Sequence, residues 1–276
     1  VGGNPQYFND DKASLGASCT TSSACPRHSV WRTDDGGLTW RGVSQGDGVT
    51  GGLHVDDHAI VFDPSVSPSR VFNGNDGGIW RSDDKGARWT SMNTNIAITQ
   101  FQSVGLHPSN PAVVIGGTQD NGTNILDPGL EAPPAWFHAD FGDGGQAIID
   151  QSDPQRMLHT YYNSSFLFMG PAKSTIGGAG GPGSWEFVGS YYGYGTYYYN
   201  GMDPTDPVSF YAPLAQHPAY SPNVVYFGSN KLYRSPDPQP PFGVESWTAV
   251  SPALTKSPTN YGAYLSAIGV FPKLVA

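Results

Sequence analysis

The chain carries two copies of one eight-residue pattern, in which Ser or Thr, Asp, Gly and Trp stand at fixed spacing. The first copy is Thr33, Asp35, Gly37 and Trp40, and the second is Ser82, Asp84, Gly86 and Trp89. A short stretch with apolar residues comes before each copy, at residues 29–32 and 78–81. Asp can accept backbone N–H groups across a turn, Gly can adopt a positive φ, and Trp can fill the space beneath. We therefore predict that each copy is the tip of a β-hairpin.

A longer repeat of about 44 residues surrounds these turns. Each copy has an apolar strand pattern, a turn that contains Pro or Asp, and a second strand pattern rich in aliphatic residues. Four copies begin near residues 59, 103, 146 and 212, and a fifth begins at Ser266. Many short strands at regular spacing predict an all-β fold made of antiparallel sheets.

The two turns resemble the Asp-box, or bacterial neuraminidase repeat, of sialidase-like, xyloglucanase-like and sortilin-like β-propellers. The resemblance runs from about residue 30 to residue 270 and is weakest over 172–210. It implies a β-propeller of four-stranded antiparallel blades. The amino-terminal segment supplies late strands of a blade and the carboxyl-terminal segment supplies early ones, so joining them implies about five blades in a closed ring. The alternative is a piece of a larger propeller. The Asp-box is structural in those families and leaves the activity open.

We expect residues 1–276 to form a single propeller domain. Residues 1–28 form an amino-terminal loop segment in this interpretation, and residues 172–201 form an insertion rich in Gly and aromatic residues. Cys19 and Cys25 are the only cysteines, and no further Cys or His stands at zinc-ligand spacing. A loop-closing disulfide between them predicts a secreted or periplasmic protein, whereas two unpaired thiols are the alternative.

The charge balance excludes some partners. The net charge is −9, and Lys and Arg together number 14. This composition argues against nucleic-acid binding, which needs a basic surface. No apolar stretch is long enough to predict a membrane span. A glycan or a peptide is the expected ligand, and the sequence does not set the oligomeric state.

Polar residues flank the first strands of the repeats at corresponding places. Asp57 and His58 precede one first strand, Asp143 precedes another, and Asp76 and the pair Asp120 and Asn121 follow second strands. In the resembling propellers the first strands line a central channel, which implies that these loops gather at its mouth.

This acidic group has three interpretations. Asp57, Asp76, Asp120 and Asp143 are the candidate catalytic carboxyl groups of a glycoside hydrolase, with His58 as an orienting or proton-transferring group. Alternatively, a calcium ion is held by oxygens of Asp57, Asp76, Asp120, Asn121 and Asp143. In the third interpretation each Asp only caps its own turn. We expect no required cofactor, and calcium is the one candidate ion.

Aromatic residues gather between residues 161 and 199. The candidate sugar-stacking residues are Tyr161, Tyr162, Trp185, Tyr192, Tyr194 and Tyr197. The alternative is a strand whose alternate tyrosines are packed and solvated.

These patterns predict a secreted carbohydrate-active propeller that hydrolyses a glycosidic bond with channel aspartates. A sialidase is disfavoured, since only three Glu occur and no Arg flanks a first strand in the way that a carboxylate-binding cluster needs. The alternative function is a non-catalytic, sortilin-like propeller that binds a peptide, a protein or a glycan.

Overall fold

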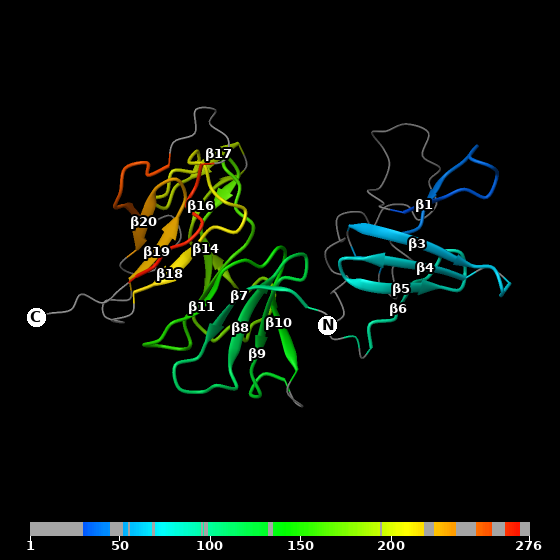
Figure 1. Ribbon diagram of the computed structural model, residues 1–276, viewed down its shortest axis with the longest axis horizontal. Coiled ribbons are helices and arrows are strands. Elements are labelled where there is room, and N and C mark those ends of the chain that lie inside the picture. The colour runs from blue at the N-terminus through cyan, green and yellow to red at the C-terminus, as the bar shows by residue number, and fades with distance from the viewer. Residues whose placement is uncertain are drawn as a thin grey trace, which may run out of the picture. The chain divides into compact units, whose positions relative to one another are not determined.

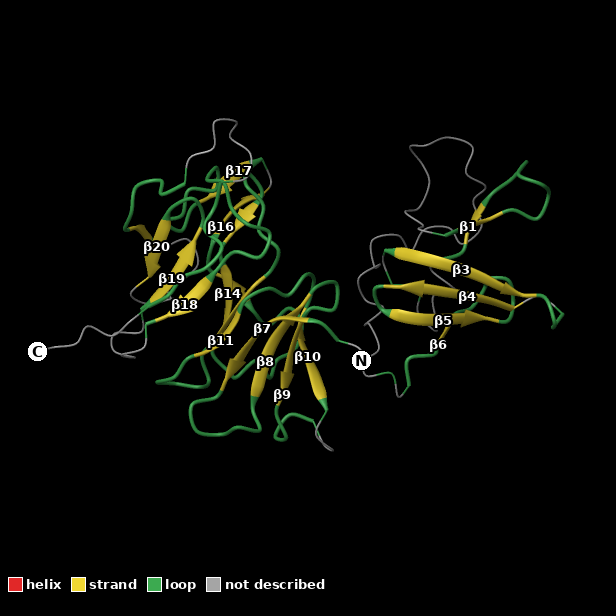
Figure 2. Cartoon of the chain, in the orientation of Figure 1, coloured by secondary structure: helices red, strands yellow, loops and turns green. Residues whose placement is uncertain are grey.

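The computed structural model describes residues 30–44, 52–54, 56–67, 70–94, 96, 99–131, 135–193, 195–217, 224–235, 247–255 and 263–270. The regular structure of these residues consists of β-strands (Figure 2). The chain divides into two compact units, Val1–Ile98 and Thr99–Ala276. In the described ranges, no helix is long and apolar enough to cross a membrane. Cys19, Cys25 and Tyr194 lie outside the described residues, so the disulfide stays a prediction.

The amino-terminal unit is one four-stranded antiparallel sheet with a small hairpin (Figure 1). The strands of the sheet, in order, are β3 (Asp57–Asp63), β4 (Arg70–Asn75), β5 (Gly78–Ser82) and β6 (Thr90–Ser91). The hairpin consists of β1 (Trp31–Arg32) and β2 (Arg41–Gly42). The hairpin and the sheet share a core, which is Val30, Val43, Leu53, Val71, Trp80 and Trp89, whereas Ile60 and Phe62 of β3 are exposed.

The carboxyl-terminal unit contains three four-stranded sheets and one three-stranded sheet. The first sheet is β7 (Phe101–Leu106), β8 (Val114–Thr118), β9 (Thr123–Leu126) and β10 (Trp136–Asp140). The second is β11 (Ala147–Ile149), β12 (Met157–Thr160), β14 (Pro171–Ser174) and β15 (Glu186–Phe187). The third is β18 (Leu214–Gln216), β19 (Val225–Gly228), β20 (Leu232–Ser235) and β21 (Thr248–Ala249). The three-stranded sheet is β13 (Phe168–Met169), β16 (Ser190–Gly193) and β17 (Thr196–Tyr198).

Each four-stranded sheet is antiparallel and begins where the sequence repeat predicts, so the all-β prediction is confirmed. Apolar residues at alternate positions bury one sheet against the next, as Ile115, Ile125 and Ile149 do between the β7–β10 sheet and the β11–β15 sheet. Two details differ from expectation. Residues 172–201 are more than an insertion, because they supply most of β14 and all of β15. The described part of the fifth repeat, residues 266–270, forms no strand.

The two eight-residue turns share one set of hydrogen bonds. In the second turn, Ser82 Oγ donates to Asp84 Oδ1 at 2.9 Å and accepts from Gly86 N at 2.7 Å, while Asp84 Oδ1 accepts from Arg88 N at 2.8 Å. The first turn repeats these bonds with Thr33, Asp35, Gly37 and Thr39. Gly37 and Gly86 both have positive φ, as the hairpin-tip prediction requires. The tryptophans differ, because Trp89 is buried whereas Trp40 is 46% exposed.

Three tryptophans join neighbouring sheets in the same way. Each tryptophan stands immediately before the last strand of its own sheet. Its indole N–H donates to a carbonyl in, or next to, the last strand of the preceding four-stranded sheet or hairpin. The donor–acceptor pairs are Trp89 to Val43 at 2.7 Å, Trp185 to Ala139 at 2.9 Å, and Trp247 to Val188 at 2.9 Å. A buried donor that finds a carbonyl on the next sheet fixes both the distance and the order of the sheets.

We expect Trp185→Phe to lower the free energy of unfolding by about 1–2 kcal/mol, because Ala139 O loses its partner while most apolar contact remains. Trp40→Phe, at the exposed tryptophan, is the matched control and should change it by less than about 0.5 kcal/mol. Urea unfolding measures both variants. Equal effects at the two positions would contradict the role given to the buried indole.

Candidate functional site

The end of the β3–β4–β5 sheet in the amino-terminal unit carries a buried polar chain. A β-bulge between Asp57 and Ala59 turns the Asp57 side chain toward the buried face of the sheet. There Asp57 Oδ1 accepts a hydrogen bond from Asn73 Nδ2 at 2.7 Å, and Asn73 Oδ1 accepts one from Asn75 Nδ2 at 2.9 Å. Asp57 Oδ2 is also buried and has no hydrogen-bond partner in the described residues. One oxygen of this carboxylate is therefore held in place by a hydrogen bond, and the other is shielded from solvent.

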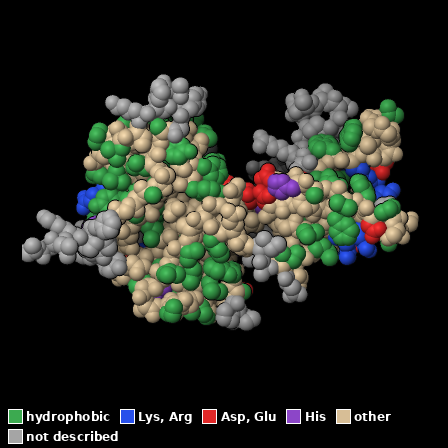
Figure 3. Space-filling model, in the orientation of Figure 1, with side chains coloured by type: hydrophobic (Ala, Val, Ile, Leu, Met, Phe, Trp, Pro, Cys, Tyr) green, Lys and Arg blue, Asp and Glu red, His purple; other side chains and the backbone are tan. Residues whose placement is uncertain are grey.

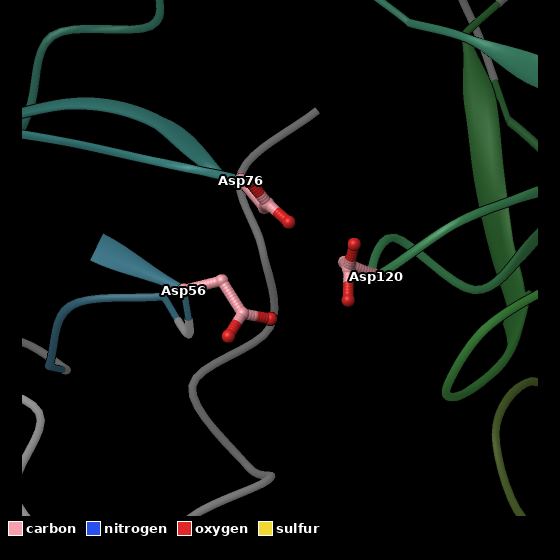
Figure 4. Close-up of side chains that lie close together, drawn as sticks. All are labelled: Asp56, Asp76 and Asp120. Atoms are coloured by element: carbon pink, nitrogen blue, oxygen red, sulfur yellow. The ribbon is translucent and has the colours of Figure 1, made fainter. Parts of the chain in front are cut away.

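Asp56 and Asp76 lie beside these hydrogen-bonded side chains, at the same end of the sheet (Figure 4). Their carboxylates offer oxygen atoms within 4.8 Å of one another, and His58 Nε2 lies 2.5 Å from Asp76 Oδ1. Figure 3 shows histidine side chains next to acidic ones on this unit. The sequence interpretation chose Asp57 and missed Asp56, because nothing in the sequence reveals which side chain of an Asp-Asp pair the bulge turns inward.

Among the described residues of this unit, Asp56 and Asp76 bring carboxylate oxygens close enough together to contact one cation. Two carboxylates are fewer ligands than the six to eight oxygens that calcium prefers. The calcium site expected from the sequence stays a prediction.

In the carboxyl-terminal unit, two acidic loops from neighbouring sheets lie together. Asp120, also labelled in Figure 4, is on the turn between β8 and β9, and Asp143 precedes β11. The backbone N–H of Asp120 donates to Asp143 Oδ1 at 3.1 Å. Asp120 has a φ of 59°, a conformation that Asp tolerates better than most residues. Asn121 lies on the same turn, and its Nδ2 donates to Gln119 O at 3.1 Å.

The two loops are held by direct backbone contact. Gly144 N donates to Thr118 O at 3.0 Å, and Gly122 N donates to Gly142 O at 2.8 Å. A Cβ on Gly144 would lie 2.2 Å from Gly122 O, and one on Gly117 would lie 2.1 Å from Gly145 O. Glycine is required at both positions, so the loops form one rigid support for the two aspartates.

A buried network lies below the Asp143 loop. A bulge between His138 and Asp140 turns the Asp140 carboxylate toward β12, where it accepts hydrogen bonds from His159 Nε2 at 3.0 Å and from Tyr161 OH. His159 is fully buried, and its ring lies edge-on to the rings of Tyr161 and Trp185. His159 Nδ1 has no hydrogen-bond partner in the described residues. This network ties β10 to β12 immediately before the loop that carries Asp143.

The stability of the chain should depend on the ionisation of Asp140. Burial raises the pKa of this carboxyl, but the hydrogen bond and charge of His159 and the hydrogen bond from Tyr161 outweigh it, so the pKa falls below 3.8. Because the folded pKa is below the unfolded one, ionised Asp140 stabilises the fold above about pH 4, and this is lost as the pH falls through the folded value. We expect the free energy of unfolding in urea to fall more steeply with decreasing pH for the native chain than for Asp140→Asn. Tyr161→Phe should shift this fall to higher pH. The same pH dependence in all three proteins would contradict this role.

The predicted aromatic platform is only partly at the surface. Trp185 was expected to stack on a sugar, but it is 8% exposed and part of the core, so this prediction is wrong. Ser174 Oγ accepts a hydrogen bond from Gly178 N, as Ser82 Oγ does from Gly86 N in the second eight-residue turn. The Gly-rich residues 177–183 lengthen the spacing from Ser174 to Trp185, so the sequence does not show Trp185 as the tryptophan of such a turn. Tyr161 is half-buried and its hydroxyl is committed to Asp140.

Five tyrosines form a ladder on and next to the β16–β17 hairpin: Tyr191, Tyr192, Tyr197, Tyr198 and Tyr199. The rings of Tyr191 and Tyr198 stack at 4.6 Å, those of Tyr192 and Tyr197 lie 4.9 Å apart, and Tyr199 lies 5.9 Å from Tyr197. Tyr192 and Tyr199 are about half exposed. Tyr162 stacks instead on Phe210, with ring centroids 5.2 Å apart.

No family model matches the sequence, and no curated protein matches it. Among solved structures, the chain is similar to an ancestral GH74 enzyme, with a TM-score of 0.31 and 15% sequence identity. The match covers 65% of this chain and 24% of that enzyme, so the chain spans about a quarter of the enzyme's length.

Proposed function

We propose that the chain belongs to a secreted, carbohydrate-active β-propeller and that aspartates at its strand ends hydrolyse a glycosidic bond. In this proposal about five four-stranded blades form a ring that strands from both chain ends close. The observation that carries the proposal is the hydrogen bond from Asp120 N to Asp143 Oδ1, because it joins acidic loops of two neighbouring sheets at one end of the unit.

Glycoside hydrolysis needs two carboxyl groups. One gives a proton to the leaving oxygen, and the other activates a water molecule or attacks the sugar. The candidates are Asp120 and Asp143 on the rigid glycine-supported loops, and Asp57 and Asp76 on the amino-terminal unit. Separations of about 5–5.5 Å between the working pair would give retention of configuration, and about 6.5–9.5 Å would give inversion.

A neutral glycan suits this surface better than an acidic one. The net charge is −9, and the candidate loops carry aspartates that would repel a carboxylate or a sulfate. The exposed rings of the β16–β17 hairpin offer flat apolar faces for the C–H groups of sugars.

The test is product formation from a panel of neutral oligosaccharides, each incubated with the purified chain and separated by chromatography. The proposal expects a shorter product from at least one glycan family, and the anomer formed gives the stereochemistry. Saturable binding of a peptide with no product from any glycan would contradict it and would favour a sortilin-like binding function. The same assay after EDTA treatment and after addition of calcium tests the candidate ion.

A further inference from the structure

The hydroxyl of Tyr211 is a buried donor without a partner. Tyr211 lies on the loop before β18, and its oxygen is buried with no hydrogen-bond partner in the described residues. Buried polar groups in folded proteins are nearly always partnered, and an unpaired one costs about 1–3 kcal/mol. The position of this hydroxyl therefore needs a reason other than packing.

The surroundings of Tyr211 place it beside the two acidic loops. A Cβ on Gly145 would lie 3.2 Å from Tyr211 Cδ1, so the ring packs on the loop that carries Asp143. Burial and the charges of Asp143 and Asp120 all raise the pKa of the phenol, which keeps its proton at any ordinary pH. The group can donate a hydrogen bond here but does not act as a base.

The loop before β18, which carries Tyr211, also carries an aromatic residue that is partly exposed. Phe210 is 44% exposed, and its ring lies 4.9 Å from that of Tyr211 at an angle of 86°. Its other neighbour is Tyr162, stacked on it at 22°. The Phe210 carbonyl accepts from Asn163 N at 2.8 Å, which fixes the loop. A partly exposed apolar ring thus lies next to Tyr211, whose own ring packs on the loop that carries Asp143.

We propose that Tyr211 and Phe210 are the sugar-binding residues of the Asp120–Asp143 site. Binding exposes the Tyr211 hydroxyl, which then donates to an oxygen of a neutral sugar. The aspartates accept from the sugar's hydroxyl groups, and the C–H face of the sugar ring packs on Phe210. This inference rests on the proposed function and adds the residues that recognise the substrate. Asp120 and Asp143 alone bring only acceptors, whereas a sugar hydroxyl both donates and accepts, so a neutral donor completes the match.

The experiment compares Tyr211→Phe with Tyr233→Phe. Each change removes one hydroxyl, but that of Tyr233 donates to Asp206 Oδ2 at 2.5 Å and accepts from Asp203 N at 3.0 Å. We expect Tyr233→Phe to lower the melting temperature and Tyr211→Phe to leave it unchanged or raise it. Among the described residues, the Tyr233 hydroxyl has hydrogen-bond partners and the Tyr211 hydroxyl has none.

Binding is measured by calorimetry with the oligosaccharide that the panel identifies. We expect Tyr211→Phe to weaken binding about tenfold or more, Phe210→Ala to weaken it as well, and Tyr233→Phe to bind like the native chain while folded. Native affinity in Tyr211→Phe, or a fall in its melting temperature equal to that of Tyr233→Phe, would overturn this inference and leave the proposed function standing. Failure of the native chain to bind any oligosaccharide of the panel would overturn both.

Discussion

Replacing Gly144 with alanine is expected to destabilise the carboxyl-terminal unit by about 3 kcal/mol or more. The new methyl group would lie 2.2 Å from Gly122 O and 2.8 Å from Thr118 N, and both of these are backbone atoms that no rotamer change can move. The two loops must separate, which breaks the hydrogen bond from Gly144 N to Thr118 O.

Gly129→Ala is the matched control for this prediction. A Cβ there meets only the carboxylate of Asp127, whose Oδ1 is 3.2 Å away and accepts an exposed hydrogen bond from Gly129 N, so a small shift of one flexible side chain suffices. Urea unfolding of the two variants should differ by about 2 kcal/mol or more. A Gly144→Ala variant as stable as Gly129→Ala would mean that the acidic loops are not in backbone contact.

The second large effect is expected on catalysis. Asp120→Asn and Asp143→Asn should each reduce product formation by about a thousandfold, because asparagine keeps the shape of the side chain but can neither carry the negative charge nor transfer a proton. An amide oxygen can still accept the hydrogen bond that Asp143 Oδ1 receives, so the melting temperature should stay nearly constant. Asp57→Asn is also expected to keep a nearly constant melting temperature, since the amide oxygen can retain the bond from Asn73.

Asp150→Asn controls for the loss of a charge. Asp150 follows β11, at the opposite end of that strand from Asp143, and its carboxylate accepts hydrogen bonds from Ser152. Turnover should stay close to native in this variant. If Asp120→Asn and Asp143→Asn unfold instead of losing turnover, these residues are turn caps, and the catalytic proposal loses its main candidates.

The sheets could be predicted from the sequence because their signals are local. Apolar strand patterns before and after each Pro or Asp turn locate β3, β7, β11 and β18, and the spacing of Ser82, Asp84 and Gly86 gives the hydrogen bonds of its turn. One repeated signal was missed. Tryptophan stands directly before β6, β15 and β21, and this position identifies Trp185 as an inter-sheet contact rather than a sugar platform.

The site could be predicted only in part because bulges and distant loops decide which side chains meet. The bulge after Asp57 turns the Asp57 side chain inward and leaves Asp56 beside Asp76. The bulge before Asp140 brings the Asp140 carboxylate to His159. Tyr211 is far from Asp143 in sequence and matches no motif. Its position depends on how the loop before β18 packs on Gly145, which no local pattern reveals.

The most direct test of the central claim is a crystal structure of the chain with a bound neutral oligosaccharide. The account predicts a sugar ring on the exposed face of Phe210, with hydroxyl groups in hydrogen-bond contact with Asp120, Asp143 and Tyr211. A glycan bound only elsewhere, with these side chains in contact with water alone, would contradict it.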